Sequence, residues 1–472
     1  MSDRPLNAFP LEPDHDEMER LGAAVLRFAT EFVEQRSAAP ASDADAAWPL
    51  AERLATAAPP EVGRPLTELL EIVDTAAARA VDTAGPGYLA YIPGGGVYTA
   101  ALGDFLACVT NRFVNLAALA PAMTAIEASV IRWLCDLFAL PATSQGILTS
   151  GGSMANLSAL VTARTALLGA DFLDGTIYVS GHTHQSVIKA AVLAGFPADA
   201  VRTVACDADL ALDPGALRDA VRADRAAGRR PFCVVATAGT TNTGAVDPIG
   251  AIASLAAEER LWCHVDAAYG GFFQLTERGR ARFAGIDRAD SITLDPHKGL
   301  FLPYGTGCLL VRDGQRLLAA HHVGGEYLQD LRAGTRIPNF ADYSPELSRD
   351  FRGLRVWLPL HLHGVDAFRA ALDEKLDLAG TVDDGLRAVA ELEVPWRPPL
   401  SIVAFRLAGA GDDANRRLLE RINASRRVAL SSTTVDGRHT LRVCVLSHRT
   451  HRDRIDEAIT VIRESARAEF RK

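Results

Sequence analysis

Residues 233–265 read CVVATAGTTNTGAVDPIGAIASLAAEERLWCHV. The apolar runs at both ends, 233–236 and 261–265, predict strands, and the helical spacing between them predicts a helix over 249–259. The same alternation extends in both directions from about residue 100 to 312. Further strands are predicted at 146–149, 176–179, 201–204, 291–294 and 307–311, and further helices at 122–138, 154–168, 185–194 and 214–227. Such alternation predicts right-handed crossovers and a mostly parallel sheet, so the fold class is α/β.

Two smaller units flank this alternating region. Before it, helical spacing over 16–36 and 66–81 predicts an N-terminal helical segment, with one short helix near 50–54 in the irregular connector. After it, a long helical segment is predicted over 345–378, and the remaining pattern predicts a small C-terminal α+β unit with strands at 401–407 and 440–445 and a final helix over 451–468. The predicted domains are 1–85, 86–365 and 366–472.

Composition excludes several classes of protein. The 472 residues are 48% hydrophobic and 23% charged, which excludes intrinsic disorder, collagen-like repeats and coiled coil. The net charge of −9, without a basic stripe, disfavours nucleic acid as a partner, and no apolar run is long enough for a membrane span. The N-terminus is too acidic for a secretory signal, and the seven scattered cysteines are expected to be reduced. A cytoplasmic protein is therefore predicted.

Lysine is scarce in this chain. Only Lys189, Lys298, Lys375 and Lys472 occur among the 49 basic residues, and arginine cannot act as an amine nucleophile. Lys298 stands in Thr293-Leu-Asp-Pro-His-Lys-Gly299, directly after a predicted strand. Polar groups at the end of a buried strand commonly line a site, although a solvated turn with a surface lysine gives the same pattern. Lys298 is therefore the first candidate for amine-based chemistry.

Three other motifs also follow predicted strands. Asp266, in Trp262-Cys-His-Val-Asp-Ala-Ala-Tyr-Gly-Gly271, is compatible with a helix cap, a metal ligand or a partner for a protonated ring nitrogen. Metal is the weaker choice, because no H-x-x-H motif or carboxylate cluster accompanies it. Thr149-Ser-Gly-Gly-Ser-Met-Ala-Asn156 predicts a glycine turn before a helix, where backbone N–H groups can bind phosphate. Val179-Ser-Gly-His-Thr-His-Gln-Ser186 carries two histidines, His182 and His184, although a histidine in such a place is more often structural than functional.

Together these groups describe a pyridoxal-phosphate (PLP) site, with an amine, an acid for a pyridinium nitrogen, a phosphate cradle and a stacking imidazole. Their order resembles that of the group II PLP-dependent decarboxylases, the family of aromatic-L-amino-acid and glutamate decarboxylases. The resemblance runs from Pro86-Gly-Tyr-Leu-Ala-Tyr91 through Phe351-Arg-Gly-Leu-Arg-Val-Trp357 to Leu441-Arg-Val443. It implies a fold type I PLP-dependent enzyme that decarboxylates an L-amino acid to the amine and CO2.

The resemblance also implies roles for individual residues. Lys298 would hold the cofactor covalently, Asp266 would pair with the pyridine nitrogen and His184 would stack on the ring, and these are the expected catalytic residues. The expected cofactor contacts are Gly152, Ser153, His184, Thr240, Thr241, Asp266, Ala268, His297 and Lys298. The expected substrate contacts are Tyr91, Phe340 and Arg442, and no metal is expected.

The sequence does not decide which class of amino-acid side chain the substrate carries. Aromatic-acid decarboxylases carry bulky aromatics where this chain has residues 111–117, and here only Phe113 is aromatic. By contrast, Tyr88, Tyr91 and Tyr98 keep part of an aromatic wall. An aromatic L-amino acid is therefore mildly favoured as substrate.

The product depends on residues 323–344, which predict a mobile active-site loop. The resembling family places a tyrosine in this loop to protonate the carbanion, and Phe340 falls nearest that position, with Tyr343 and Tyr327 as alternatives. Family members with phenylalanine there make aldehydes by oxidative deamination. An aldehyde product is thus the main alternative to the amine, and transamination and a non-catalytic scaffold are the others.

The expected partners are an amino-acid substrate and a second copy of this chain. In the resembling family the N-terminal helices wrap around the partner subunit, which implies a homodimer. Neither nucleic acid nor a membrane is expected as a partner.

Overall fold

A seven-stranded sheet forms the centre of the large domain. The computed structural model describes residues 11–322 and 337–470. The strand order is β1-β7-β6-β5-β4-β2-β3; β7 is antiparallel to both neighbours, and the other pairs are parallel. The strands are β1 (Gln145–Thr149), β2 (Gly175–Ser180), β3 (Val201–Val204), β4 (Arg230–Thr237), β5 (Trp262–Asp266), β6 (Ser291–Leu294) and β7 (Gly307–Val311). The predicted α/β class with a mostly parallel sheet is confirmed.

Helices connect and cover these strands. They are α5 (Pro121–Leu137), α6 (Gly152–Leu167), α7 (Gln185–Leu193), α8 (Pro214–Ala226) and α9 (Ile249–Glu259). Each begins and ends within two residues of its prediction, because its apolar residues follow the helical period. Helix α6 contacts β1, β7, β6, β5 and β4, and the buried small residues Ala155, Ala159 and Ala163 let it approach the sheet closely. This packing brings the first turn of α6 to the edge where several strands end.

Among the described residues of the large domain, four α-helices were not predicted. They are α4 (Tyr98–Thr110), α10 (Glu277–Arg282), α11 (Pro296–Gly299) and α12 (Gly314–His321). Helix α4 is apolar on several sides, and only Ala100 and Gly103 of its residues are buried. Its sequence therefore lacks the one-sided apolar stripe from which a surface helix is recognised.

The prediction of one continuous helical segment over 345–378 is wrong. Two helices occupy the region, α13 (Gly353–His363) and α14 (Val365–Arg387), and Gly364 separates them with φ +76°. Glycine adopts this left-handed conformation without the strain that a Cβ would introduce. The break therefore lies at the residue that permits it.

The C-terminal unit has a sheet and an apolar core of its own. Its antiparallel strand order is β10-β11-β9-β8, with β8 (Leu392–Glu393), β9 (Ile402–Leu407), β10 (Ser431–Val435) and β11 (Arg438–Cys444). Helices α15 (Asp412–Ala424) and α16 (Arg452–Phe470) pack with α14 around this core. Phe368 and Leu372 of α14 pack in the large core, whereas Leu378 and Leu386 pack in the small one. Helix α14 thus joins the two units.

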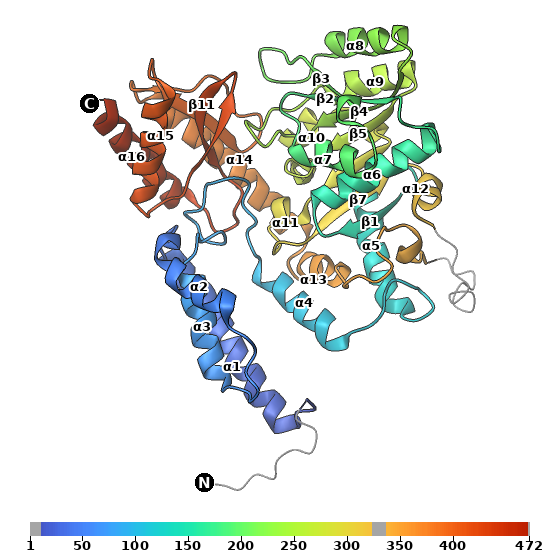
Figure 1. The fold of residues 1–472 in the computed structure, drawn as a ribbon. Coiled ribbons are helices and arrows are strands. Elements are labelled where there is room, and N and C mark those ends of the chain that lie inside the picture. The colour runs from blue at the N-terminus through green and yellow to red at the C-terminus, as the bar shows by residue number, and fades with distance from the viewer. Residues whose placement is uncertain (1–10, 323–336, 471–472) are drawn as a thin grey trace, which may run out of the picture.

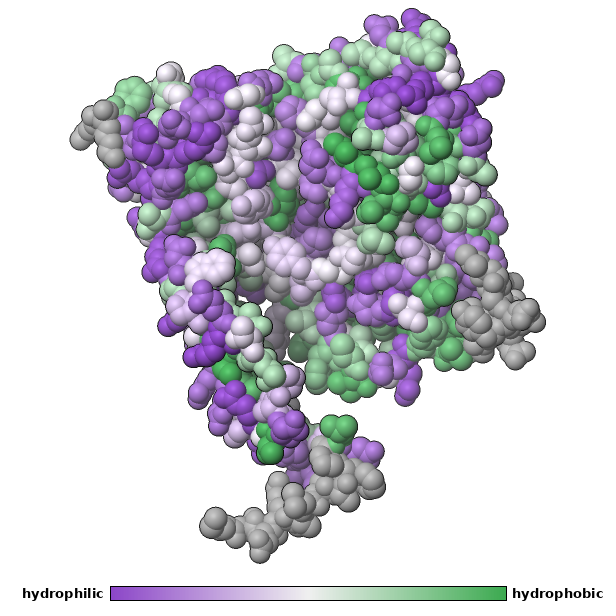
Figure 2. Space-filling view, in the orientation of Figure 1, coloured by the Kyte–Doolittle hydropathy of each residue, from purple (hydrophilic) through white to green (hydrophobic). Residues whose placement is uncertain are grey.

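The first three helices form an arm that extends away from the rest of the chain (Figure 1). They are α1 (His15–Glu34), α2 (Trp48–Thr56) and α3 (Leu66–Ala78). No residue of α1 or α3 is buried, and Val25 and Val73 are exposed. Figure 2 shows apolar side chains between the polar ones along this arm. Within the described residues, no helix combines the length and apolarity that crossing a membrane would require.

Candidate active site

A cavity of about 270 Å³ lies where the carboxyl ends of the central strands meet. Strands β4 and β5 reach it with Thr237 and Asp266, and the turns that follow β1 and β6 complete its wall. Parallel strands bring their carboxyl ends to one edge, which explains why motifs distant in sequence converge there. The lining residues are Ser150, Gly151, Gly152, Ser153, Met154, Asn156, His184, Ser186, Thr237, Gly239, Thr241, Asp266, Ala268, Tyr269, Asp295, His297 and Lys298.

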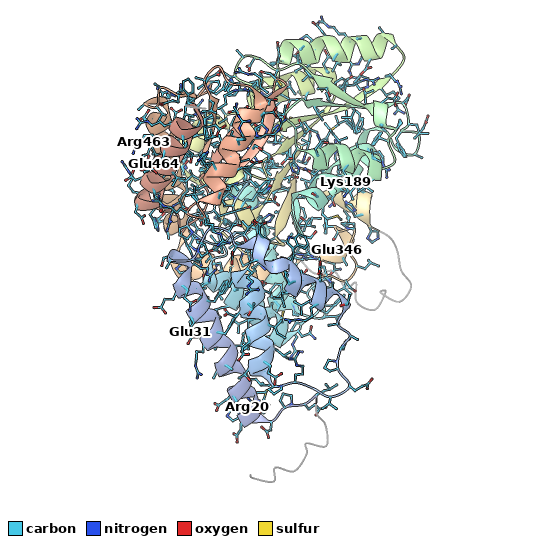
Figure 3. The ribbon with its side chains drawn as sticks, turned by 60° about the vertical axis from the view of Figure 1, so that its left-hand side comes forward. Arg20, Glu31, Lys189, Glu346, Arg463 and Glu464 are labelled. Carbon is cyan, nitrogen blue, oxygen red and sulfur yellow. The ribbon has the colours of Figure 1, made fainter. Side chains whose placement is uncertain are left out.

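Lys298 presents its amine to this cavity from α11. Its Nζ lies 2.8 Å from Oδ2 of Asp295, and about a fifth of the side chain is exposed. Asp295 itself is buried, and its Oδ1 has no hydrogen-bond partner. Among the other lysines, Lys189 is exposed on α7 (Figure 3), and Lys375 is buried in the C-terminal unit. Within the described chain, Lys298 is thus the lysine that a ligand in the cavity can reach.

Asp266 stands at the end of β5 with both carboxylate oxygens engaged. Oδ1 accepts the backbone N–H of Ala268 at 3.1 Å, and Oδ2 accepts Nδ2 of Asn156 at 3.0 Å. The residue is only 5% exposed, so these bonds set the plane of the carboxylate. A buried carboxylate held in this way is suited to pairing with a protonated ring nitrogen.

His184 caps the first turn of α7. Its Nδ1 accepts the backbone N–H of Ser186 at 3.2 Å and lies 2.8 Å from the Ser186 hydroxyl. Burial lowers the pKa of His184; the charge of Asp266 acts in the opposite direction and that of Lys298 in the same one. The imidazole is therefore neutral near pH 7.

The other end of the cavity is suited to an anion. The first turn of α6 directs the free backbone N–H groups of Gly152 and Ser153 outward, where the helix dipole favours negative charge. A Cβ on Gly152 would lie 3.0 Å from Oδ2 of Asp295 and 3.2 Å from Cβ of Ala268, so a side chain there would fill the cradle. His297 donates from Nδ1 to the Thr306 carbonyl at 2.7 Å, which leaves Nε2 available, and burial lowers its pKa.

These features fit PLP. The cavity offers an amine, a carboxylate for the ring nitrogen, an imidazole for the ring face and a phosphate cradle. Two buried oxygens of its lining residues, Oδ1 of Asp295 and Oγ1 of Thr237, have no partner within the chain. Buried polar atoms of this kind are normally satisfied by a ligand or by water.

Comparison with known proteins agrees with this reading. The profile of the pyridoxal-dependent decarboxylase conserved domain matches residues 50–408. The chain belongs to the pyridoxal-dependent decarboxylase family. It is 35% identical over 449 residues to the aromatic-L-amino-acid decarboxylase of Bacillus atrophaeus, with 93% of each chain covered. The predictions of a PLP-dependent carboxy-lyase and of its cofactor are confirmed.

Solved structures of related proteins share the whole fold of this decarboxylase. The Oryza sativa TDC solved with PLP and tryptamine aligns with a TM-score of 0.90 at 29% identity and covers 99% of each chain. The Rhodiola rosea 4-hydroxyphenylacetaldehyde synthase aligns with a TM-score of 0.88 at 25% identity, covering 96% of this chain and 99% of its own. The predicted fold type is therefore confirmed.

Most of the predicted cofactor residues of the decarboxylase line the cavity. Those present are Gly152, Ser153, His184, Thr241, Asp266, Ala268, His297 and Lys298. Thr240 is fully buried beside the cavity, with its hydroxyl 3.3 Å from that of Thr243. It therefore supports the loop that carries Thr241.

The three predicted substrate residues lie outside the cavity lining of a single chain. Arg442 is buried and donates to the Thr241 carbonyl and, at 2.9 Å, to the Ser431 hydroxyl. Tyr91 is 63% exposed. Phe340 is fully buried, with the Arg349 guanidinium 4.9 Å from its ring centre. Their contact with substrate stays a prediction.

The predicted active-site loop falls largely on residues 323–336, which lie outside the described part of the decarboxylase, as does Tyr327. Of the other candidates for the proton donor, Phe340 begins a short 3-10 helix, Phe340–Asp342, and Tyr343 follows it half-buried. Burial raises the pKa of Tyr343 and the charge of Asp342 raises it further, so its hydroxyl keeps its proton at neutral pH.

Sequence reasoning missed Asp295 and Asn156, although both stand inside motifs that it quoted. Asp295 lies three residues before Lys298, one helical turn away, and that spacing could have indicated an ion pair. Asn156 lies on the inner face of α6, and its neighbours there are small residues of an ordinary core helix. A polar residue buried among them was the available signal, because buried amides need partners.

Proposed function

We propose that this enzyme decarboxylates an aromatic L-amino acid to the corresponding amine and CO2. The observation that carries the proposal is the placement of Lys298, Asp266 and His184 around one cavity with an anion cradle. An aromatic substrate is supported by the aromatic-L-amino-acid decarboxylase, which is 35% identical, and by the TDC that binds tryptamine in a closely similar fold.

Each residue has a defined task in this reaction. PLP, when bound, withdraws the electrons that remain when the substrate carboxylate leaves as CO2. Asp266 would keep the ring nitrogen protonated, which stabilises the developing charge more than the ground state. His184 would hold the ring by stacking, an interaction worth ~1 kcal/mol between aromatic groups. Gly152, Ser153 and His297 would hold the phosphate, and Lys298 would attach the cofactor.

Substrate binding is assigned to residues at the edge of the cavity. Arg442 is proposed to receive the substrate carboxylate, and its buried Nε has no hydrogen-bond partner within the chain. Tyr91 is proposed to contact the aromatic side chain and Phe340 to lie in the loop over it. The domain limits 1–85, 86–365 and 366–472 remain part of this proposal.

A cytoplasmic homodimer is the proposed form of the enzyme. The exposed apolar residues of the arm, together with Phe105, Leu106 and Val109 on α4, provide a surface for a second copy. Figure 2 shows apolar side chains near α4 on the underside of the large domain. All seven cysteines are free and five are buried, as in a reducing compartment. Sedimentation at micromolar concentration tests the dimer, and a monomer there would refute it.

An aldehyde product is the second candidate. It is supported by the presence of Phe340, which has no proton to give, and by the similar fold of a 4-hydroxyphenylacetaldehyde synthase. The test is the ratio of amine to aldehyde, with and without oxygen. If aldehyde, ammonia and peroxide replace the amine in air, oxidative deamination is the reaction, and Phe340→Tyr should restore amine.

The activity itself is tested by supplying purified holoenzyme with a panel of L-amino acids. Release of CO2 should be fastest with an aromatic amino acid, with the amine formed in equal amount. Lys298→Ala serves as the inactive control. A preference for glutamate or for a diamino acid would contradict the aromatic assignment, and transfer of the amino group without CO2 would contradict decarboxylation.

A further inference from the structure

A continuous line of buried side chains runs from the interior of the sheet to Asp266. Nε1 of Trp262 lies 2.8 Å from the Ser291 hydroxyl, which lies 2.8 Å from Nδ1 of His264. Nε2 of His264 lies 3.0 Å from Oδ1 of Asn156. Nδ2 of Asn156 lies 3.0 Å from Oδ2 of Asp266. Trp262, Ser291, His264 and Asn156 are each at most 1% exposed, so they bond to one another rather than to water.

The direction of every bond in this line follows from the chemistry of its ends. The carboxylate of Asp266 accepts only, so the amide of Asn156 must turn its NH2 group toward it. The amide oxygen then faces His264 and accepts its Nε2–H. Because Nδ1 of His264 carries no proton in that tautomer, it accepts the Ser291 hydroxyl, and the Ser291 oxygen accepts the indole N–H of Trp262. Burial lowers the pKa of His264 to about 4, which agrees with a neutral ring.

A branch of the same line reaches His184. The second N–H of the Asn156 amide points to the Ser186 oxygen at 3.0 Å. The Ser186 hydroxyl is then free to donate to Nδ1 of His184 at 2.8 Å, where the backbone N–H of Ser186 also donates. The proton of neutral His184 is thus on Nε2. One amide therefore orients both the acid and the imidazole of the cofactor site.

We propose that Asn156 and His264 are positioning residues of this decarboxylase, which together fix the orientation of Asp266 and the tautomer of His184 toward the cofactor. They act through these two groups, and Asn156 also lines the cavity. The proposal concerns the cofactor site alone, so it can be tested without a substrate and independently of the proposed activity.

The alternative is that these residues only satisfy one another inside the core. The two roles differ in what a substitution changes. A purely structural role predicts lower stability with cofactor affinity unchanged in the protein that remains folded. A positioning role predicts weaker cofactor binding and an altered absorption spectrum of bound PLP in folded protein.

Asn156→Asp is the sharpest variant. It keeps the shape of the side chain but places a carboxylate 3.0 Å from Asp266, where repulsion disfavours the ionised pair. PLP affinity of the folded apoprotein, measured by absorbance titration, should fall by about tenfold to a hundredfold. The pH dependence of the bound-cofactor spectrum should shift as well. Ser158→Ala is the matched control, because Ser158 is equally buried on α6 and its hydroxyl has no partner.

His264 supplies a second, independent pair of variants. His264→Gln retains an N–H that can reach Oδ1 of Asn156, whereas His264→Phe keeps the ring and removes both nitrogens. We expect His264→Gln to bind PLP within about threefold of the unmodified enzyme and His264→Phe to bind about tenfold more weakly. Equal affinities for the two variants would overturn the proposal, as would an Asn156→Asp protein that binds PLP like Ser158→Ala. If Asn156→Asp does not fold, the His264 pair decides.

Discussion

Two lysines of this enzyme are shielded from water beside a carboxylate, and their surroundings differ. Lys298 pairs with Asp295 at 2.8 Å, and its side chain is about 20% exposed toward the cavity. Lys375 pairs with Glu374 at 2.7 Å, donates to the Thr450 carbonyl at 2.5 Å and is fully buried. Burial lowers the pKa of Lys375, with the charge of Glu374 acting in the opposite direction.

The contrast shows that a lysine amine with a lowered pKa is not necessarily one that a ligand can reach. Lys375 has the lowered pKa that is often taken as the mark of a nucleophile. Its amine, however, is held by a backbone carbonyl inside the C-terminal unit, and Lys375 is not among the residues that line the cavity of Lys298. The Lys298 amine, by contrast, borders the cavity and pairs with the Asp295 carboxylate. Access to the cavity, rather than burial, therefore distinguishes Lys298, the proposed reactive lysine, from Lys375.

The largest expected effect comes from Lys298→Ala. It should abolish covalent attachment of PLP and turnover, because no other described lysine borders the cavity. Borohydride trapping followed by peptide mapping measures this, with Lys189→Ala and Lys375→Met as controls that keep the label. A label on any other lysine would show that the assignment is wrong.

Asp266→Asn tests the carboxylate at the end of β5. The protein should fold and attach PLP, because the amide can occupy the same space, but decarboxylation should fall by ~10²-fold as a major electrostatic interaction is lost. Steady-state kinetics and the visible spectrum of the cofactor provide the two measurements. Turnover at the unmodified rate would exclude pairing with the ring nitrogen.

Asp295→Asn measures how much the Asp295 carboxylate contributes to the rate at which Lys298 attaches PLP. Loss of the charge-assisted bond should leave the amine less well oriented and slow covalent attachment by about tenfold. Rapid mixing of apoprotein with PLP follows the attachment rate. An unchanged rate would mean that the open space alone makes Lys298 reactive.

Lys375→Met should have the smallest effect on activity and a measurable one on stability. The Thr450 carbonyl loses its donor, which costs roughly 1–3 kcal/mol when a buried group is left unpaired. The folded pKa of Lys375 lies below its ordinary value of 10.5, so between the two values the unfolded chain binds the extra proton. Stability of the unmodified enzyme relative to the variant should therefore rise with pH toward 10.5. Urea unfolding of both proteins at two pH values checks the sign.

Much of the fold followed from periodicity alone. Most strands and helices between α5 and β7 carry regularly spaced apolar residues, and every strand of this sheet except the edge strand β3 is mostly buried. Periodicity failed where a single residue interrupts the pattern, as Gly364 does between α13 and α14. It also failed for α4, whose apolar residues lie on several faces.

The site was predictable to the extent that its residues stand at strand ends. Asp266 is the last residue of β5 and Lys298 lies in the short helix after β6, so topology alone brings them to one edge. Asn156 and His264 lie inside elements, where spacing cannot distinguish a polar contact from core packing. Phe340 illustrates a further limit, because counting residues in a loop does not say which side chain faces the site.

If the enzyme is the proposed homodimer, the projecting arm makes its stability depend on the protein concentration. Helices α1 and α3 bury no residue within their own chain, and isolated helices of this length are marginal in water. In the proposed homodimer, contacts with the partner subunit stabilise these helices. The stability of the helices therefore depends on the protein concentration. Each tenfold dilution then costs the associated state about 1.4 kcal/mol per mole of dimer. Dilute samples should be cut first by protease within the arm, and thermal unfolding should occur at higher temperature as the protein is concentrated.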